Sequence, residues 1–146
     1  MAILHDRTVR TSLEDRLAEL RPESRARWGH MSVDQMLWHV NEAMESMLGR
    51  VALEPVKRPL PSPVLRFLVL NMPWPKGAPT NPRFVAKSQY DFETERKRCR
   101  ALMAELTSQP IGTLRQAHPT LGRMNGRHLS RLTAKHLDHH FKQFGV

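Results

Sequence analysis

Hydrophobic positions recur with the period of an α-helix in four long stretches, and no stretch alternates convincingly in the manner of a strand. The helical stretches are residues 8–20, 33–48, 89–107 and 126–144. The second has the clearest signals, since Ser32 and Gln35 have the spacing of a capping box and Gly49 is a natural stop. Four long amphipathic helices without strands predict an all-α fold, a helical bundle in a single domain over residues 1–146.

The segment between the second and third helices has a different composition. Eight of the 11 prolines fall within residues 55–82, and proline disfavours long regular helices. The apolar piece SPVLRFLVLN predicts a short helix with Ser62 as its cap and Pro63 at its first position. We expect the rest, MPWPKGAPTNP, to be an ordered surface loop, which either serves a function or merely connects the helices. A turn-rich linker, residues 108–125, precedes the last helix.

The composition is typical of a soluble globular protein, with 40% hydrophobic and 25% charged residues. No apolar run approaches the roughly 20 residues that cross a bilayer. The N-terminal sequence MAILHDRTVRTS has charges where a signal peptide has its apolar segment. We therefore expect a cytoplasmic protein without a membrane partner. The single cysteine, Cys99, excludes an intramolecular disulfide, and its apolar helix side predicts a core residue rather than a nucleophile.

The net charge of +9 favours contact with phosphates. The basic residues are, however, spread along the chain, and many are interrupted by acidic ones. The densest run comprises Arg96, Lys97, Arg98 and Arg100. It contains none of the stacking aromatics that single-stranded nucleic acid usually requires, so we expect it to form the solvated face of a helix. Nucleic acid is thus the less favoured partner, although the composition does not exclude it.

The last helical stretch contains KHLDHHFKQFGV, in which three histidines fall among apolar residues. At about 100° per residue, its buried face is defined by Leu129, Leu132, Thr133 and Phe144. His136 and His140 lie within that arc, one turn apart, whereas His139 lies at its edge and Asp138 points away. A pair at i and i+4 is the spacing by which a helix offers two imidazoles to one metal ion. Alone it is a weak signal, because satisfied core histidines are common.

A third histidine strengthens this prediction. His39 lies on the second helix, between Met36 and Ala43 at spacings of three and four, and is therefore turned toward the core. Three buried rings without a shared partner would be costly, and one divalent cation satisfies all of them. The pattern predicts a three-histidine metal site formed by His39, His136 and His140. The alternative is that each ring bonds separately to a carbonyl or a carboxylate.

Three segments of the chain resemble the DinB/YfiT-like superfamily, in a branch named only as a domain of unknown function. They are WGHMSVDQMLWHVNEA (28–43), PWPKGAPTNP (73–82) and HPTLGRMNGRHLSRLTAKHLDHHFKQFG (118–145). Members are four-helix bundles with a long crossover, which bind a divalent metal through one histidine of the second helix and an H-x-x-x-H pair. The resemblance implies the same fold here, with a proline-rich crossover between the second and third long helices. It also implies His39, His136 and His140 as ligands.

Residues 136–143 also match the H-x-x-H-H-x-x-Q pattern of the superfamily. His139 and Gln143 are therefore candidates for orienting a ligand or a nearby water, although each has a simpler interpretation as a polar group at the helix edge. The remaining histidines have no matching role, and we expect them at surface or loop positions; they are His5, His30, His118 and His128.

Three neutral nitrogen ligands without a fourth protein donor describe an open site, which can acidify a bound water or thiol. Imidazoles suit several divalent transition metals, of which zinc or nickel is favoured here. Some relatives use a low-molecular-weight thiol as transferases or isomerases, and others are labelled metal-dependent hydrolases. The resemblance therefore implies a thiol-dependent transferase or a hydrolase acting on a small-molecule substrate.

No residue is an evident general acid or base, because Asp138 points outward and we expect Glu42 to lie off the inner face. Trp74 and Lys76 of the proline-rich segment are candidates for covering the metal and presenting a cation to an anionic substrate. The alternative function is a non-catalytic metal-binding or interaction bundle that contacts polyanions through its basic surface. The sequence is also compatible with a homodimer.

Overall fold

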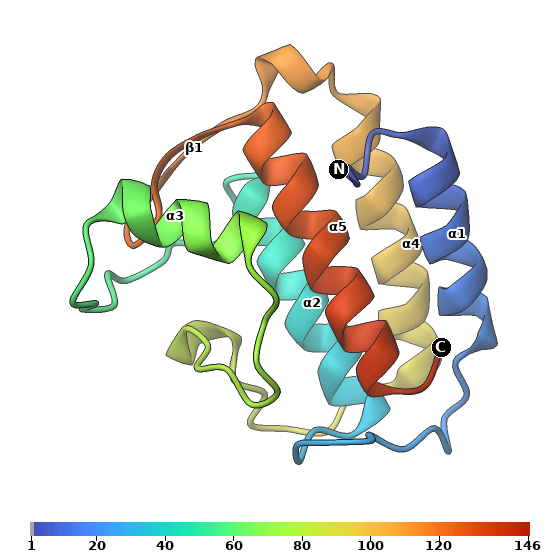
Figure 1. The fold of residues 1–146 in the computed structure, drawn as a ribbon. Coiled ribbons are helices and arrows are strands. Elements are labelled where there is room, and N and C mark those ends of the chain that lie inside the picture. Colours follow the sequence, from blue (N-terminus) through green and yellow to red (C-terminus); the bar gives the residue numbers. More distant parts are fainter. Residues whose placement is uncertain (1) are drawn as a thin grey trace.

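The computed structural model describes residues 2–146, and its fold is mostly helical (Figure 1). These residues form five α-helices: α1 (Arg7–Glu19), α2 (Val33–Met47), α3 (Ser62–Asn71), α4 (Phe92–Ser108) and α5 (Gly126–Gln143). They also form two 3₁₀ turns, η1 (Pro82–Phe84) and η2 (Ile111–Thr113), and two strands, β1 (Arg115–His118) and β2 (Gly122–Asn125). The helices α1, α4, α2 and α5 contact one another in that cyclic order, and α3 packs to the side against α5 and β2.

The core lies between the four long helices, whose apolar sides face inward. Its fully buried large side chains are Leu4, Leu17, Leu20, Met36, Leu37, Val40, Met44, Met103, Met124, Leu129, Leu137 and Phe141. Cys99 belongs to this core, as expected, and burial raises the pKa of its thiol to about 12. The thiol is therefore protonated and inert at neutral pH.

Side-chain caps set where the long helices begin. The helices α1, α4 and α5 follow Asp6, Asp91 and Asn125, whose side chains accept hydrogen bonds from first-turn N–H groups. The predicted capping box of α2 is present, with the Ser32 N–H donating to Gln35 at 3.1 Å. All four predicted helices form, and the largest difference in their ends is the start of α4, three residues later than expected because Asp91 caps it.

The expectation of a strand-free chain is wrong at one place, where residues 115–125 form a two-stranded antiparallel hairpin. Arg115 pairs with Asn125 and His118 with Gly122. The His118 ring closes the turn, because its Nδ1 accepts the N–H groups of Thr120 and Leu121, each at 3.0 Å. The strands RQAH and GRMN contain one apolar residue each, so they are too short and too polar to show an alternating pattern.

The segment between α2 and α4 contains α3, η1 and irregular chain. The predicted short helix forms as α3, but Ser62 is its first helical residue rather than its cap, which is Pro61. Beyond α3, the indole of Trp74 donates to the Val69 carbonyl at 2.7 Å, which holds the loop against the helix end. No helix within residues 2–146 is both long and apolar enough to cross a membrane.

The α2–α4 contact buries charged side chains, which corrects two expectations. Glu42 is only 7% exposed, because it faces α4 rather than solvent. Arg98, expected on a solvated face, reaches Glu42 at 2.6 Å and Glu95 at 3.2 Å. Its neighbours Lys97 and Arg100 are exposed as predicted. The period places a residue on a helix face, but it does not reveal which neighbouring helix covers that face.

Candidate metal centre

His39 of α2 meets His136 and His140 of α5 where the two helices pack together. Each ring offers one nitrogen, and these nitrogens all lie within 4.8 Å of one another. The ring centroids are separated by 4.7–4.8 Å for all three pairs. The structure therefore brings together the three residues that the sequence singled out, from positions almost a hundred residues apart.

Two of the three rings are oriented by acceptors on their outer side. The Nδ1 atom of His39 lies 2.8 Å from the Phe84 carbonyl of η1. The Nδ1 atom of His140 lies 2.7 Å from Oε1 of Gln143, whose amide nitrogen donates to the Trp28 carbonyl at 2.8 Å. Each Nδ1 must carry the hydrogen, because its partner oxygen only accepts. Nε2 of His39 and of His140 therefore carries a lone pair rather than a hydrogen, as in histidines that bind metals.

The third ring closes the cluster. Nε2 of His136 lies 2.9 Å from Nε2 of His39, the separation of a hydrogen bond. Because the tautomer of His39 leaves only a lone pair on that side, His136 must donate when no ion lies between the rings. An ion bound by both Nε2 atoms requires His136 to move this hydrogen to Nδ1. The arrangement thus fits a shared cation after one tautomer change.

The environment keeps the three imidazoles uncharged. Burial lowers the pKa of all three rings, with repulsion from neighbouring histidines as a further cause. The pKa of His140 falls to about 3, and that of His136 lies well below 6.5. The neutral imidazole is the form that binds a metal ion. No carboxylate or thiolate joins the cluster within residues 2–146, so its donors are nitrogen alone.

His139 lies beside the cluster rather than in it. Its ring centroid is 5.1 Å from that of His140, and the ring lies between the indoles of Trp28 at 5.7 Å and Trp74 at 5.4 Å. The Trp74 ring also approaches His136, at 5.8 Å. The edge position predicted for His139 is thus where two aromatic side chains meet the cluster.

Two lysines lie over these indoles. The Lys76 ammonium is 4.9 Å from the ring of Trp28, and the Lys135 ammonium is 5.2 Å from the ring of Trp74. Lys135 also donates to the Val69 carbonyl at 2.7 Å. The surroundings of the histidine cluster therefore combine aromatic surface with positive charge.

Sequence reasoning missed the backbone groups that support the cluster. The carbonyls of Phe84 and Trp28 have no side-chain signature, and they are set by the paths of η1 and of residues 28–30. One signal was visible in WGH: Gly29 has a φ of +79°, and a Cβ there would lie 2.9 Å from the Gln143 amide nitrogen. A glycine is therefore needed where this backbone approaches Gln143.

The other four histidines are not members of the cluster. His30 is exposed, whereas His118 and His128 serve local turns and caps. His5 is more than a surface residue, because Nδ1 lies 2.8 Å from the Ser130 hydroxyl and Nε2 lies 3.0 Å from the Gln109 carbonyl. It ties the N-terminal segment to α5 and to the end of α4.

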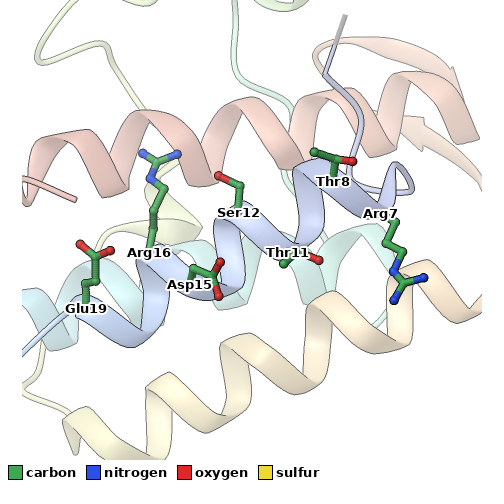
Figure 2. A pocket seen from close by; sticks show the side chains of 7 residues that line it. All are labelled: Arg7, Thr8, Thr11, Ser12, Asp15, Arg16 and Glu19. Carbon is green, nitrogen blue, oxygen red and sulfur yellow. The ribbon is translucent and has the colours of Figure 1, made fainter.

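An open depression elsewhere on the surface offers no competing site (Figure 2). It is lined by Arg7, Thr8, Thr11, Ser12, Asp15, Arg16 and Glu19. All these residues belong to α1, so no second element converges on it. The histidine cluster, by contrast, combines groups from α2, η1 and α5.

Comparison with known proteins assigns the family. No curated protein and no solved structure gives a significant match to the chain. The family model described as the DinB superfamily matches residues 6–144, which include every long helix and all three clustered histidines. The chain belongs to the DinB superfamily.

Proposed function

We propose that this protein is a metal-dependent enzyme in which His39, His136 and His140 bind one divalent transition-metal ion. The carrying observation is the orientation of the rings: the Phe84 carbonyl and the Gln143 amide engage Nδ1 on two of them. This leaves Nε2 atoms converging on one place. Three such donors leave a coordination position for water or for a substrate.

The chemistry follows from that open position. A divalent cation held there acidifies a water or thiol bound to it, or polarises a carbonyl group. Zinc and nickel are the favoured ions, since both accept imidazole ligands. We infer a thiol-dependent transferase or a hydrolase of the DinB/YfiT-like type, built on a four-helix bundle of α1, α2, α4 and α5. The proline-rich residues 55–82 are its crossover.

The surrounding residues supply binding and orientation in this proposal. Gln143 holds the ring of His140, and its own amide is held by the Trp28 carbonyl. Trp28 and Trp74 exclude water from the side of the cluster that they cover, and Lys76 attracts an anionic group of a small-molecule substrate. His139 orients a water or substrate group, because its ring packs directly beside His140.

One observation favours a second candidate, a metal-binding protein without catalysis. No aspartate or glutamate joins the three histidines within the described residues, so a carboxylate base is absent from the cluster. His139 is the group that separates the candidates. If the protein is an enzyme, we expect His139→Phe to lower its turnover. A non-catalytic metal protein shows no turnover with either residue.

The primary test is the metal content of the purified protein. We expect about one divalent ion per chain, and loss of that ion in His140→Ala. His128→Ala is the matched control, because His128 lies on the same helix but caps its first turn away from the cluster. The proposal fails if the wild-type protein carries no ion and binds none on addition. A thiol-transfer and ester-hydrolysis screen of the loaded protein then tests catalysis separately.

A further inference from the structure

Basic and acidic residues are segregated along this chain. Residues 55–90 and 106–137 contain eleven of the 23 lysines and arginines and none of the 14 aspartates and glutamates. The remainder contains twelve basic and fourteen acidic residues. The whole net charge of +9 therefore originates in these two segments.

The two segments meet on one side of the molecule. Figure 1 shows α3 and the hairpin on the side of α5 that faces away from α1, and contacts join α3 to both α5 and β2. Arg66 of α3 donates to the Leu121 carbonyl at 2.9 Å, and Lys135 of α5 donates to the Val69 carbonyl at 2.7 Å. Cations from both segments thus lie beside α3.

The same region carries the exposed apolar side chains. The exposed large hydrophobic residues of the described chain are Leu60, Val64, Phe67, Leu68, Met72 and Val85, and every one lies within residues 55–90. Phe67 is 60% exposed. Val64, Phe67 and Leu68 have the spacing of one helical face, and Leu70 on the other side is buried against the protein.

An apolar outward face is unusual for a surface helix, since such helices normally present charged groups to water. The outer face of α4 follows that rule, with Lys97 and Arg100 exposed. An apolar helix face bordered by cations is instead typical of helices that lie in a membrane interface, with side chains among the acyl chains and cations at the phosphates.

We propose that α3 docks this protein onto the surface of membranes containing anionic phospholipids. Phe67 and Val64 enter the headgroup region, while the exposed cations that precede the helix, Lys57 and Arg58, contact lipid phosphates. Sequence analysis predicted no membrane partner because no segment is long enough to span a bilayer. Docking at the surface needs no spanning segment.

Charge complementarity favours an anionic membrane surface over a second copy of the chain as the partner of α3. An isologous dimer through α3 would bring the basic segments of two copies together, and such like-charge juxtaposition is unfavourable. Nucleic acid would satisfy the cations but leave Val64, Phe67 and Leu68 in water. An anionic bilayer surface satisfies both the charge and the apolar area.

The test is co-sedimentation with vesicles of phosphatidylcholine alone or of phosphatidylcholine mixed with phosphatidylglycerol. We expect binding only to the mixed vesicles, weakening as salt rises. Val64→Gln/Phe67→Gln lowers the vesicle partition coefficient by about tenfold or more, because both apolar side chains leave the interface. Lys57→Glu/Arg58→Glu lowers it to a similar degree.

The matched control is Lys97→Glu/Arg100→Glu, which makes the same charge change on the exposed face of α4 and keeps full binding. Circular dichroism and melting temperature confirm that each variant is folded. The proposal is overturned if mixed vesicles bind no protein, or if the control weakens binding as much as Lys57→Glu/Arg58→Glu. A concentration-dependent dimer that Val64→Gln/Phe67→Gln abolishes also overturns it, since α3 then contacts a second copy.

Discussion

Helix α2 has two buried polar sides that differ in how their groups are satisfied. Toward α4 it places Glu42, which meets Arg98 at 2.6 Å. Toward α5 it places His39, which meets two further imidazoles of the same kind. On the first side opposite charges compensate each other, whereas on the second three neutral imidazoles converge. The difference separates charges that are paired within the protein from imidazole nitrogens that can share a cation.

On the α2–α4 side, the buried charged groups find opposite charges within the protein, and the amide nitrogen of Asn41 adds hydrogen bonds. Asn41 donates to the carbonyl and the carboxylate of Glu95, at 2.9 and 2.8 Å. Burial opposes the charge of Arg98, but its hydrogen bond to Glu42 and the attraction of Glu95 outweigh this effect and raise its pKa. A second arginine, Arg83 of η1, reaches Glu42 at 3.1 Å. Such a cluster stabilises the contact without any external ligand.

The turn η1 serves both sides of α2. Its Arg83 pairs with Glu42, and the carbonyl of the next residue, Phe84, orients His39. The ion-paired side therefore anchors the backbone that holds a histidine in place. We infer that the α2–α4 cluster is structural, and that it supports the histidine cluster through η1.

The largest expected effect is the acid sensitivity of the metal-free protein. Burial lowers the pKa of His140 from 6.5 to about 3 in the folded state, so the unfolded state binds more protons between these values. The free energy of unfolding is therefore highest above pH 6.5, where His140 is neutral in both states. It falls as the pH decreases toward 3, because protonation of His140 favours the unfolded state. For this group alone the loss is roughly 4 kcal/mol over three pH units. Urea unfolding across this range measures it, and His140→Leu should flatten the dependence; an unchanged dependence contradicts the pKa shift.

The next effect concerns the ion-paired side. Arg98→Met leaves the buried carboxylates of Glu42 and Glu95 without their main partner, and we expect a loss of about 3 kcal/mol in the free energy of unfolding. The exposed Arg100→Met on the same helix is the control and should change it by less than about 0.5 kcal/mol. Chemical denaturation measures both. Equal effects would show that the α2–α4 cluster contributes nothing specific.

A smaller effect tests the support of the histidine side. Gln143→Leu removes the acceptor for His140 Nδ1, and we expect metal affinity to fall about 10- to 100-fold. Calorimetric titration of the metal-free protein measures this. The control is Gln116→Leu, whose side chain bonds to the Ser46 carbonyl away from the histidines. Unchanged affinity in Gln143→Leu would mean that Gln143 does not orient a ligand.

The smallest expected effect, that of replacing His136, distinguishes the two sides of α2 most clearly. His136→Leu should change the unfolding free energy of the metal-free protein by less than about 1 kcal/mol, because apolar packing offsets the loss of one hydrogen bond between neutral rings. The same variant should lose the thermal stabilisation that added metal gives the wild type. A large destabilisation without metal would assign the histidines a structural role.

The sequence predicted the helices and the histidine cluster because both depend on periodic placement along a helix. His136 and His140 share a face by spacing alone, and His39 faces inward by the apolar residues around it. The hairpin was missed because its strands are short and polar. The burial of Glu42 was missed because the period does not tell which helix will cover a given face. The backbone contributions from Phe84 and Trp28 depend on tertiary structure, and Gly29 beside Trp28 is the single sign of them in the sequence.

The most direct test of the central claim is a crystal structure of the protein loaded with zinc or nickel. We predict one ion bound by Nε2 of His39, His136 and His140, with Nδ1 of His39 still donating to the Phe84 carbonyl. The remaining coordination positions should hold solvent or a small molecule. An ion bound elsewhere, or a fourth protein ligand that closes the site, would contradict the open three-histidine centre.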